Sequence, residues 1–240
     1  MKENETLKIN PLPSKTWYWL HLNDTTVKWN GDVQPCMVMA EEPEQVSEAD
    51  LNIKKMTTGV GAEADTLFSD ENLPVLQLTA KAEDGERIIR LDISGEDKEN
   101  AAGTVYIATE ENAHVTVIEK FISGKKAQSD LAFRTKLYAK KNSTIRLIQI
   151  NMLDEGQRLL NAVGSVCDET AKLDVLQMLI GRGDVYNGIQ TELEGDQSEL
   201  HTEIGYIGQK QQSLDMNLVV NHWGKKTNCN IQVDGTLKDA

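Results

Sequence analysis

The last two-thirds of the chain carry a repeat of about 28 residues, in which each copy reads as a strand, a polar turn and another strand. The copies align on one apolar position just after the turn. In successive copies this position is occupied by Val115, Ile145, Leu173, Leu200 and Cys229. We expect Ile89 to hold the same position in an earlier and weaker copy. A period of this length indicates stacked structural units, because no single unit can bury its apolar face alone.

Apolar and polar residues alternate within each copy, as in Ile89, Leu91 and Ile93. A period of two residues is that of a β-strand that buries one face. The turns contain pairs such as Glu111–Asn112 and Lys141–Asn142, which tolerate left-handed backbone. The repeat and the alternation together predict an all-β chain that forms a parallel β-helix, with about 28 residues per coil.

Two regions follow from the pattern. Residues 1–72 are predicted to form a small irregular α+β segment, with a strand or hairpin in the Trp-rich stretch 12–30 and one or two short helices within 41–72. Residues 73–240 are predicted to form the β-helix core. Because the chain stops inside a coil, we expect the natural protein to continue beyond Ala240 or another molecule to cover this edge.

The composition excludes several classes of function. The net charge of −13 argues against a nucleic-acid or anionic-membrane surface, which would need clustered Lys and Arg. No apolar run approaches the 18 residues of a membrane span, and the N-terminus lacks the apolar stretch of a secretory signal. Three widely spaced cysteines, Cys36, Cys167 and Cys229, form neither a disulfide framework nor a metal-binding pair. A cytoplasmic, reduced protein is expected.

Candidate binding motifs are weak. Residues 59–64 fit the G-x-G-x-x-A pattern of a nucleotide loop, but no buried strand precedes them, so we expect a flexible turn. The tripeptide Arg182-Gly183-Asp184 is interpreted as a chance match. Cys229 lies in the inward register, where a small buried hydrophobe is more common than a reactive thiol. The histidines are scattered and predicted to lie on the surface, with most interest in the last of them: His21, His114, His201 and His222.

Glu192 and Glu194 could serve as acid and base, as in a β-helical carbohydrate-active enzyme. In so acidic a chain, a solvated face is the preferred interpretation. We therefore predict no catalytic and no cofactor-binding residues, and leave metal ligands open.

The final segment contains a spaced pattern of the form D-x-N-x-x-x-x-H-x-G, followed by V-x-G-x-L-x-D. Its positions are Asp215, Asn217, His222, Gly224, Lys226, Thr227, Val233, Gly235, Leu237 and Asp239. The pattern resembles the core signature of the SufB/SufD family, the scaffold proteins of SUF iron–sulfur cluster assembly. Residues 12–23 are similar to the Leu-Pro…Thr-Trp segment near the N-terminus of SufD-like members.

The resemblance implies a right-handed parallel β-helix and a non-catalytic scaffold subunit that works with a SufB-type subunit and a SufC-type ATPase. It also implies that the functional His and Cys positions and most partner contacts lie beyond residue 240. We expect no cofactor in this chain, because the complex as a whole handles the cluster, and a homodimer through the exposed C-terminal edge. Two alternatives remain at this point, a β-helical carbohydrate-active enzyme and a plain structural or adhesive solenoid.

Overall fold

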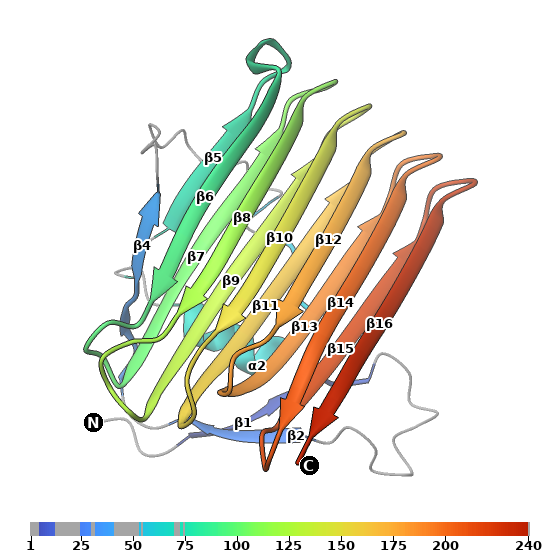
Figure 1. Cartoon of the computed structure of the whole chain (residues 1–240). Helices are drawn as coiled ribbons and strands as arrows, with labels where there is room; N and C mark the ends of the chain where they lie inside the picture. The colour runs from blue at the N-terminus through green and yellow to red at the C-terminus, as the bar shows by residue number, and fades with distance from the viewer. Residues whose placement is uncertain are drawn as a thin grey trace.

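The computed structural model describes residues 5–12, 25–29, 32–40, 53, 55–69, 73 and 75–239. They form a β-solenoid of about six turns, built from parallel stacked coils of about 28 residues (Figure 1). Within these ranges the helical segments are short: α2 (Ala62–Asp65), η2 (Thr66–Phe68) and η3 (Ala82–Asp84). The predicted β-helix is therefore confirmed.

The strands before the repeat are β1 (Glu5–Ile9), β2 (Thr25–Trp29), β3 (Gln34–Pro35) and β4 (Met37–Ala40). The strands of the coils are β5 (Val75–Ala80), β6 (Glu86–Ser94), β7 (Asn100–Thr109), β8 (His114–Ile122), β9 (Ser129–Ala139), β10 (Thr144–Met152), β11 (Gln157–Cys167), β12 (Lys172–Leu179), β13 (Asp184–Leu193), β14 (Glu199–Gln209), β15 (Leu214–His222) and β16 (Asn228–Lys238). The predicted strand in the Trp-rich stretch corresponds to β2, while residues 13–24 lie outside the described residues.

Each complete coil gives one strand to each of two facing sheets. The even sheet has the order β16-β14-β12-β10-β8-β6-β4, and the odd sheet has the order β15-β13-β11-β9-β7-β3, with β5 also paired to β7. Strand β4 runs antiparallel to β6, and the other pairs described in these two sheets are parallel. In Figure 1 the coils advance side by side from green to red.

The predicted interior row is confirmed by the strand register, which pairs its members one after another along the even sheet: Val115, Ile145, Leu173, Leu200 and Cys229. The first four are buried, and Cys229 is half-buried on the last strand. The prediction for Ile89 was wrong, because Arg87 is the partner of Val115 and Ile89 pairs with Val117. The offset is two residues, so Ile89 still points inward. The short helix η3 lies in the turn before β6, so the number of residues between this turn and the inward position differs from that in the later coils.

The turns leading from the odd sheet back to the even sheet share one conformation. One residue in each has left-handed backbone, with φ between 58° and 63°: Asn112, Asn142, Thr170, Gln197 and Lys226. In the first four of these turns the N–H of this residue donates to the equivalent turn of the next coil, as from Asn142 to the Glu169 carbonyl at 3.1 Å. Asn tolerates this conformation well, whereas a β-branched residue such as Thr170 adopts it at a cost.

The outer face of the odd sheet is covered by the N-terminal layer, which we define as β1, β2 and residues 56–69. The layer packs its apolar side chains against small or apolar residues on β7, β9 and β11, among them Ala132. The buried side chains of the layer include Leu7, Val27, Val60 and Phe68. Figure 1 shows β1, β2 and α2 lying against the stacked strands. A second apolar core therefore lies outside the solenoid.

Residues 59–64, the G-x-G-x-x-A segment, belong to this layer. A Cβ atom added at Gly59 would lie 2.3 Å from the backbone N of Ile189, and one added at Gly188 would lie 2.3 Å from the N of Val60. Glycine is required on both sides because the two backbones touch. The expected flexible turn is thus a packed segment, with Val60 fully buried. The helix that follows has four residues, which is too short to present a phosphate site.

Candidate functional site

A column of polar side chains crosses the largely apolar interior of the solenoid. On the even sheet, Glu119, Gln149 and Gln177 occupy equivalent positions in three successive coils. Asn161 and Asn187 occupy equivalent positions on the facing odd sheet. All five side chains are at most 1% exposed. The column ends at apolar neighbours, with Leu91 paired to Glu119 at one end and Ile204 paired to Gln177 at the other.

The amides of the column bond to one another between the sheets. Asn161 Nδ2 donates to Gln149 Oε1 at 2.7 Å and to Asn187 Oδ1 at 2.8 Å. Gln177 Nε2 donates to Gln149 Oε1 at 2.7 Å, and Asn187 Nδ2 donates to Gln177 Oε1 at 2.8 Å. A buried polar group without a partner is costly, and the amides here largely satisfy each other. They therefore fix which residues face each other across the interior.

Glu119 is the end of this network and its single acidic member. Its carboxyl oxygens lie 3.1 and 3.0 Å from the Thr135 hydroxyl, and Oε2 accepts a hydrogen bond of 2.7 Å from Gln149 Nε2. Burial raises its pKa from 4.5 to about 7, although the hydrogen bonds from Gln149 and Thr135 oppose the shift. Desolvation of the charged form therefore dominates, and the group titrates near neutral pH.

Sequence reasoning missed this column, although a signal was present. The third inward residue of three successive repeats is Glu119, Gln149 and Gln177, where the pattern calls for an apolar side chain. A polar residue that recurs at one interior position predicts a hydrogen-bonded ladder, because each copy lies beside the next.

Two residues of the sequence signature attach the N-terminal layer to the solenoid. Asp215, on β15, accepts hydrogen bonds from Asn10 Nδ2 at 2.8 Å and from the Thr25 hydroxyl. Asn217 Nδ2 donates to the carbonyl of Gly59 at 2.8 Å and to that of Pro11 at 3.3 Å. These polar atoms are used for tertiary contacts rather than for a substrate.

The histidines of the described chain do not converge. His222 is exposed, and its Nδ1 lies 2.7 Å from the Thr227 hydroxyl, which closes the turn after β15. His114 is exposed, and His201 is half-exposed with Nε2 3.3 Å from Glu203. The fourth candidate, His21, lies outside the described residues. Among the residues that the structure describes, no three His, Cys, Asp or Glu side chains are grouped to hold a metal ion.

The cysteines are separate thiols. Cys36 and Cys167 are buried, and burial raises the pKa of each to about 12. The pKa of Cys229 is also raised by desolvation, although this residue is only half-buried. A thiol with a raised pKa is a poor nucleophile and a poor ligand at neutral pH, because both roles need the thiolate.

Glu192 and Glu194 both line a depression of about 400 Å³ beside the N-terminal layer. Partial burial acts to raise the pKa of Glu192, but hydrogen bonds from Gln190, Trp223 and Asn221 outweigh it and lower the pKa overall. A carboxylate held in its ionised form is a poor general acid. Its register neighbours in the adjacent coils are Val166 and Asn221, so no carboxylates align across coils at this position. The carbohydrate-enzyme alternative is therefore not favoured.

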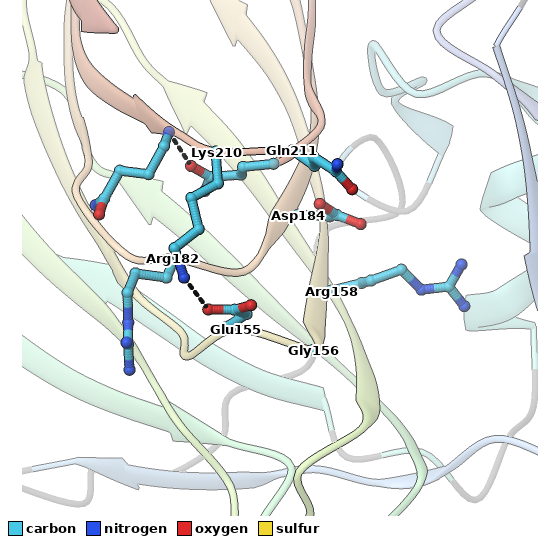
Figure 2. Close-up of a pocket in the computed structure, with 9 residues that line it drawn as sticks. Glu155, Gly156, Arg158, Arg182, Asp184, Lys210 and Gln211 are labelled. Atoms are coloured by element: carbon cyan, nitrogen blue, oxygen red, sulfur yellow. Dashed lines mark hydrogen bonds and ion pairs between the residues drawn. The ribbon is translucent and has the colours of Figure 1, made fainter. Parts of the chain in front are cut away.

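A larger depression of about 480 Å³ lies among the turns that follow β10, β12 and β14 (Figure 2). Its cations are matched by carboxylates: Lys210 Nζ lies 3.1 Å from Glu155, Arg182 lies 2.8 Å from Asp154, and Arg158 bonds to Asp130. Arg182 is also the first residue of the Arg-Gly-Asp tripeptide, which here forms a turn and the start of β13. The depression is an ion-paired surface rather than a catalytic cleft.

These observations define a class of protein, a β-solenoid whose described polar groups mainly stabilise its own structure. Residues 92–240 match the family model described as SUF system FeS cluster assembly, SufBD core domain. The match covers more than half of the chain, so the chain belongs to the SufBD family and takes part in iron–sulfur cluster assembly by the SUF system. No curated protein and no solved structure gave a match. No helix among the described residues is long and apolar enough to cross a membrane.

Proposed function

We propose that this chain is a non-catalytic, SufD-like scaffold subunit that acts in the cytoplasm with a SufB-type subunit and a SufC-type ATPase. The observation that carries the proposal is the combination of the family match with the use of the described polar groups. The interior amides bond to each other, and the signature residues Asp215 and Asn217 bond to the N-terminal layer. The similarity of residues 12–23 to SufD-like members supports the branch.

The chemistry of the thiols favours a scaffold over a site that builds the cluster. An iron–sulfur cluster is held by thiolates, usually four. The described chain has three dispersed cysteines, of which Cys36 and Cys167 are buried with raised pKa values. The cluster is thus a cargo of the whole complex, and this chain supplies no bound cofactor of its own.

A solenoid is well suited to carry motion from an ATPase to a subunit interface. Its coils are joined by two continuous parallel sheets, and the polar column links those sheets across the interior. Because packed and hydrogen-bonded elements move as units, a displacement at one end of the solenoid shifts the other end with it.

Strand β16 lies at one edge of the even sheet among the strands that the structure describes. Among the described strands, β16 pairs with β14 alone, and its side chains Ile231, Val233 and Leu237 are exposed. Unpaired backbone groups on an edge favour strand addition by another chain. A SUF subunit or a second copy of this chain would add to β16, and the latter arrangement gives the predicted edge homodimer.

The proposal is tested by co-expressing the chain with SufB-type and SufC-type proteins. We expect a stable complex that carries a cluster, whereas the purified chain alone contains no stoichiometric iron or other metal and hydrolyses no polysaccharide. Stoichiometric metal in the isolated chain, lost on replacing Cys229 by Ser, would contradict the scaffold role. Failure to associate with either SUF protein would contradict the proposed partners.

A further inference from the structure

Trp223, just after β15, is the most exposed of the large apolar side chains that the structure describes, at 70% of its full accessible surface. The residue is nevertheless held in place by two hydrogen bonds. Its indole Nε1 donates to Glu192 Oε2 at 2.7 Å, and its backbone N–H donates to the carbonyl of Leu193 at 3.0 Å. Tryptophan is enriched among the residues that dominate protein interfaces, so a ring that is both fixed and exposed indicates a contact site.

The carboxylate beside the ring is kept in its charged form. Glu192 Oε1 accepts hydrogen bonds from Gln190 Nε2 at 2.8 Å and from Asn221 Nδ2 at 2.9 Å, in addition to the bond from the indole to Oε2. Three donated hydrogen bonds favour the ionised carboxylate. All three donors are neutral, so they orient the carboxylate without cancelling its charge. A negative charge at the edge of the indole reinforces the attraction of the ring face for a cation.

The negative charge at this place is not matched within the described chain. Glu192 and the exposed Glu194 line the depression of about 400 Å³, and neither forms an ion pair with a described residue. Lys55 is the only cation among the described residues that line the depression, and it is not paired with either carboxylate. By contrast, the cations of the larger depression in Figure 2 are each bonded to a carboxylate.

Aromatic rings elsewhere in the chain lie against cations. For four rings of the described chain, a lysine or arginine lies within 6.0 Å of the ring centroid, as Arg134 does over Phe68 at 4.7 Å. Trp223 has no such cation among the described residues, although tryptophan attracts cations more strongly than the other rings. Lys225 and Lys226 lie in the following turn, and neither is paired with the carboxylates beside the ring. The ring and its carboxylates therefore lack the cation that this arrangement favours.

We propose that Trp223, Glu192 and Glu194 form a docking site, here called the arginine site, for an arginine side chain of a partner protein. The guanidinium would stack on the exposed indole, and its N–H groups would face the two carboxylates. Arginine fits better than lysine because a planar guanidinium stacks on a ring and donates from its edge at the same time. The inference rests on the proposed scaffold role for the existence of a partner, but not for the chemistry of the site.

The first test uses short acetylated peptides and needs no SUF protein. A peptide with a central arginine should shift the indole N–H resonance of Trp223 in a saturable way, with a dissociation constant on the order of 1 mM. The resonance is assigned by its loss in Trp223→Phe. A lysine peptide should bind several-fold more weakly, and a citrulline peptide, which has the same shape without the charge, should cause no saturable shift. Equal binding of the arginine and citrulline peptides would overturn the proposal, as would the absence of any shift.

The second test repeats the peptide titration with variants of the site. Glu192→Gln keeps an acceptor for the indole and removes the charge, so it should weaken binding of the arginine peptide about fivefold. The control is Glu203→Gln, which makes the same change at an exposed position on β14 of the even sheet and should bind as the native chain does. Circular dichroism confirms that each variant is folded. Native binding by Glu192→Gln would show that the carboxylate does not hold the cation.

The third test concerns the occupant. When the chain is co-expressed with SufB-type and SufC-type proteins, Trp223→Ala should weaken their association with it about tenfold, and an excess of the arginine peptide should have the same effect on the native complex. A complex that forms equally well with Trp223→Ala would reject a partner's arginine as the occupant. Tighter binding of free arginine than of the peptide would also reject it, in favour of a small-molecule site. Failure of the native chain to associate with either protein would contradict the proposed function instead, while the peptide titrations still decide the chemistry of the site.

Discussion

Replacing Glu119 by Gln is expected to stabilise the protein at neutral and alkaline pH. The native carboxyl is fully buried, and its pKa is raised from 4.5 to about 7. Between these two pH values the folded chain holds a proton that the unfolded chain has released. The free energy of unfolding therefore falls as the pH rises from 4.5 to 7, and the loss is complete above that range.

The magnitude follows from the size of the shift. Each unit of pKa difference between the folded and unfolded states corresponds to 1.36 kcal/mol, so the native protein loses about 3 kcal/mol through this group. Gln has nearly the same shape, can still accept from Gln149 and can donate to Thr135, and has no charge to desolvate. Glu119→Gln should match the native protein near pH 4.5 and exceed its stability by about 3 kcal/mol at pH 8.

Urea unfolding followed by circular dichroism at several pH values measures this difference. In a thermal scan at pH 8 it corresponds to roughly 6–12 °C in Tm for a chain of this size. Glu111→Gln, which removes one carboxyl group from an exposed turn, is the matched control. Equal pH dependence in Glu119→Gln and the native protein would refute the argument that the buried carboxyl binds its proton near neutrality.

Three further predictions concern packing, a turn and the thiols. Gly188→Ala should release the N-terminal layer and increase the rate of amide hydrogen exchange in that layer, because the added Cβ would lie 2.3 Å from the backbone nitrogen of Val60. The control Gly205→Ala has open space around the added Cβ and should behave as the native protein. Thr170→Asn should raise the free energy of unfolding by about 1 kcal/mol, since Asn accepts left-handed backbone at lower cost. Cys36 and Cys167 should resist a thiol reagent at pH 8 until the chain unfolds, as a mass spectrum of the labelled protein will show.

The solenoid could be predicted because its periodicity and its burial have one cause. In a stacked coil, residues one period apart become neighbours, so Val115, Ile145 and Leu173 had to be apolar together. The position of Ile89 could not be obtained by the same count, because a helical turn before β6 changes the spacing without changing the alternation. Pattern reveals which face a residue occupies more reliably than which neighbour it meets.

The packing of residues 59–64 against the solenoid could not be predicted. The partners of Gly59 are Gly188 and Ile189, which lie far along the chain. The sequence next to either glycine does not indicate this contact. Gly188 reads locally as an isolated glycine in a strand, a sign of close backbone approach with no indication of the partner. The contact exists only once the coils are stacked, so it is a property of the fold rather than of either segment.

The signature residues show why a sequence motif need not mark an active site. Asn217 supplies a buried donor for the carbonyl of Gly59, which lies 158 positions earlier in the chain. Asp215 accepts from Asn10, 205 positions earlier. Loss of either side chain would leave buried polar groups of the N-terminal layer without a partner, at a cost of about 1–3 kcal/mol each. The spacing D-x-N places both side chains on the outer face of β15, since strand residues two apart point the same way. These two residues of the motif therefore attach the N-terminal layer to the solenoid. We expect substitution of either residue to lower the stability of the fold rather than to remove a catalytic group.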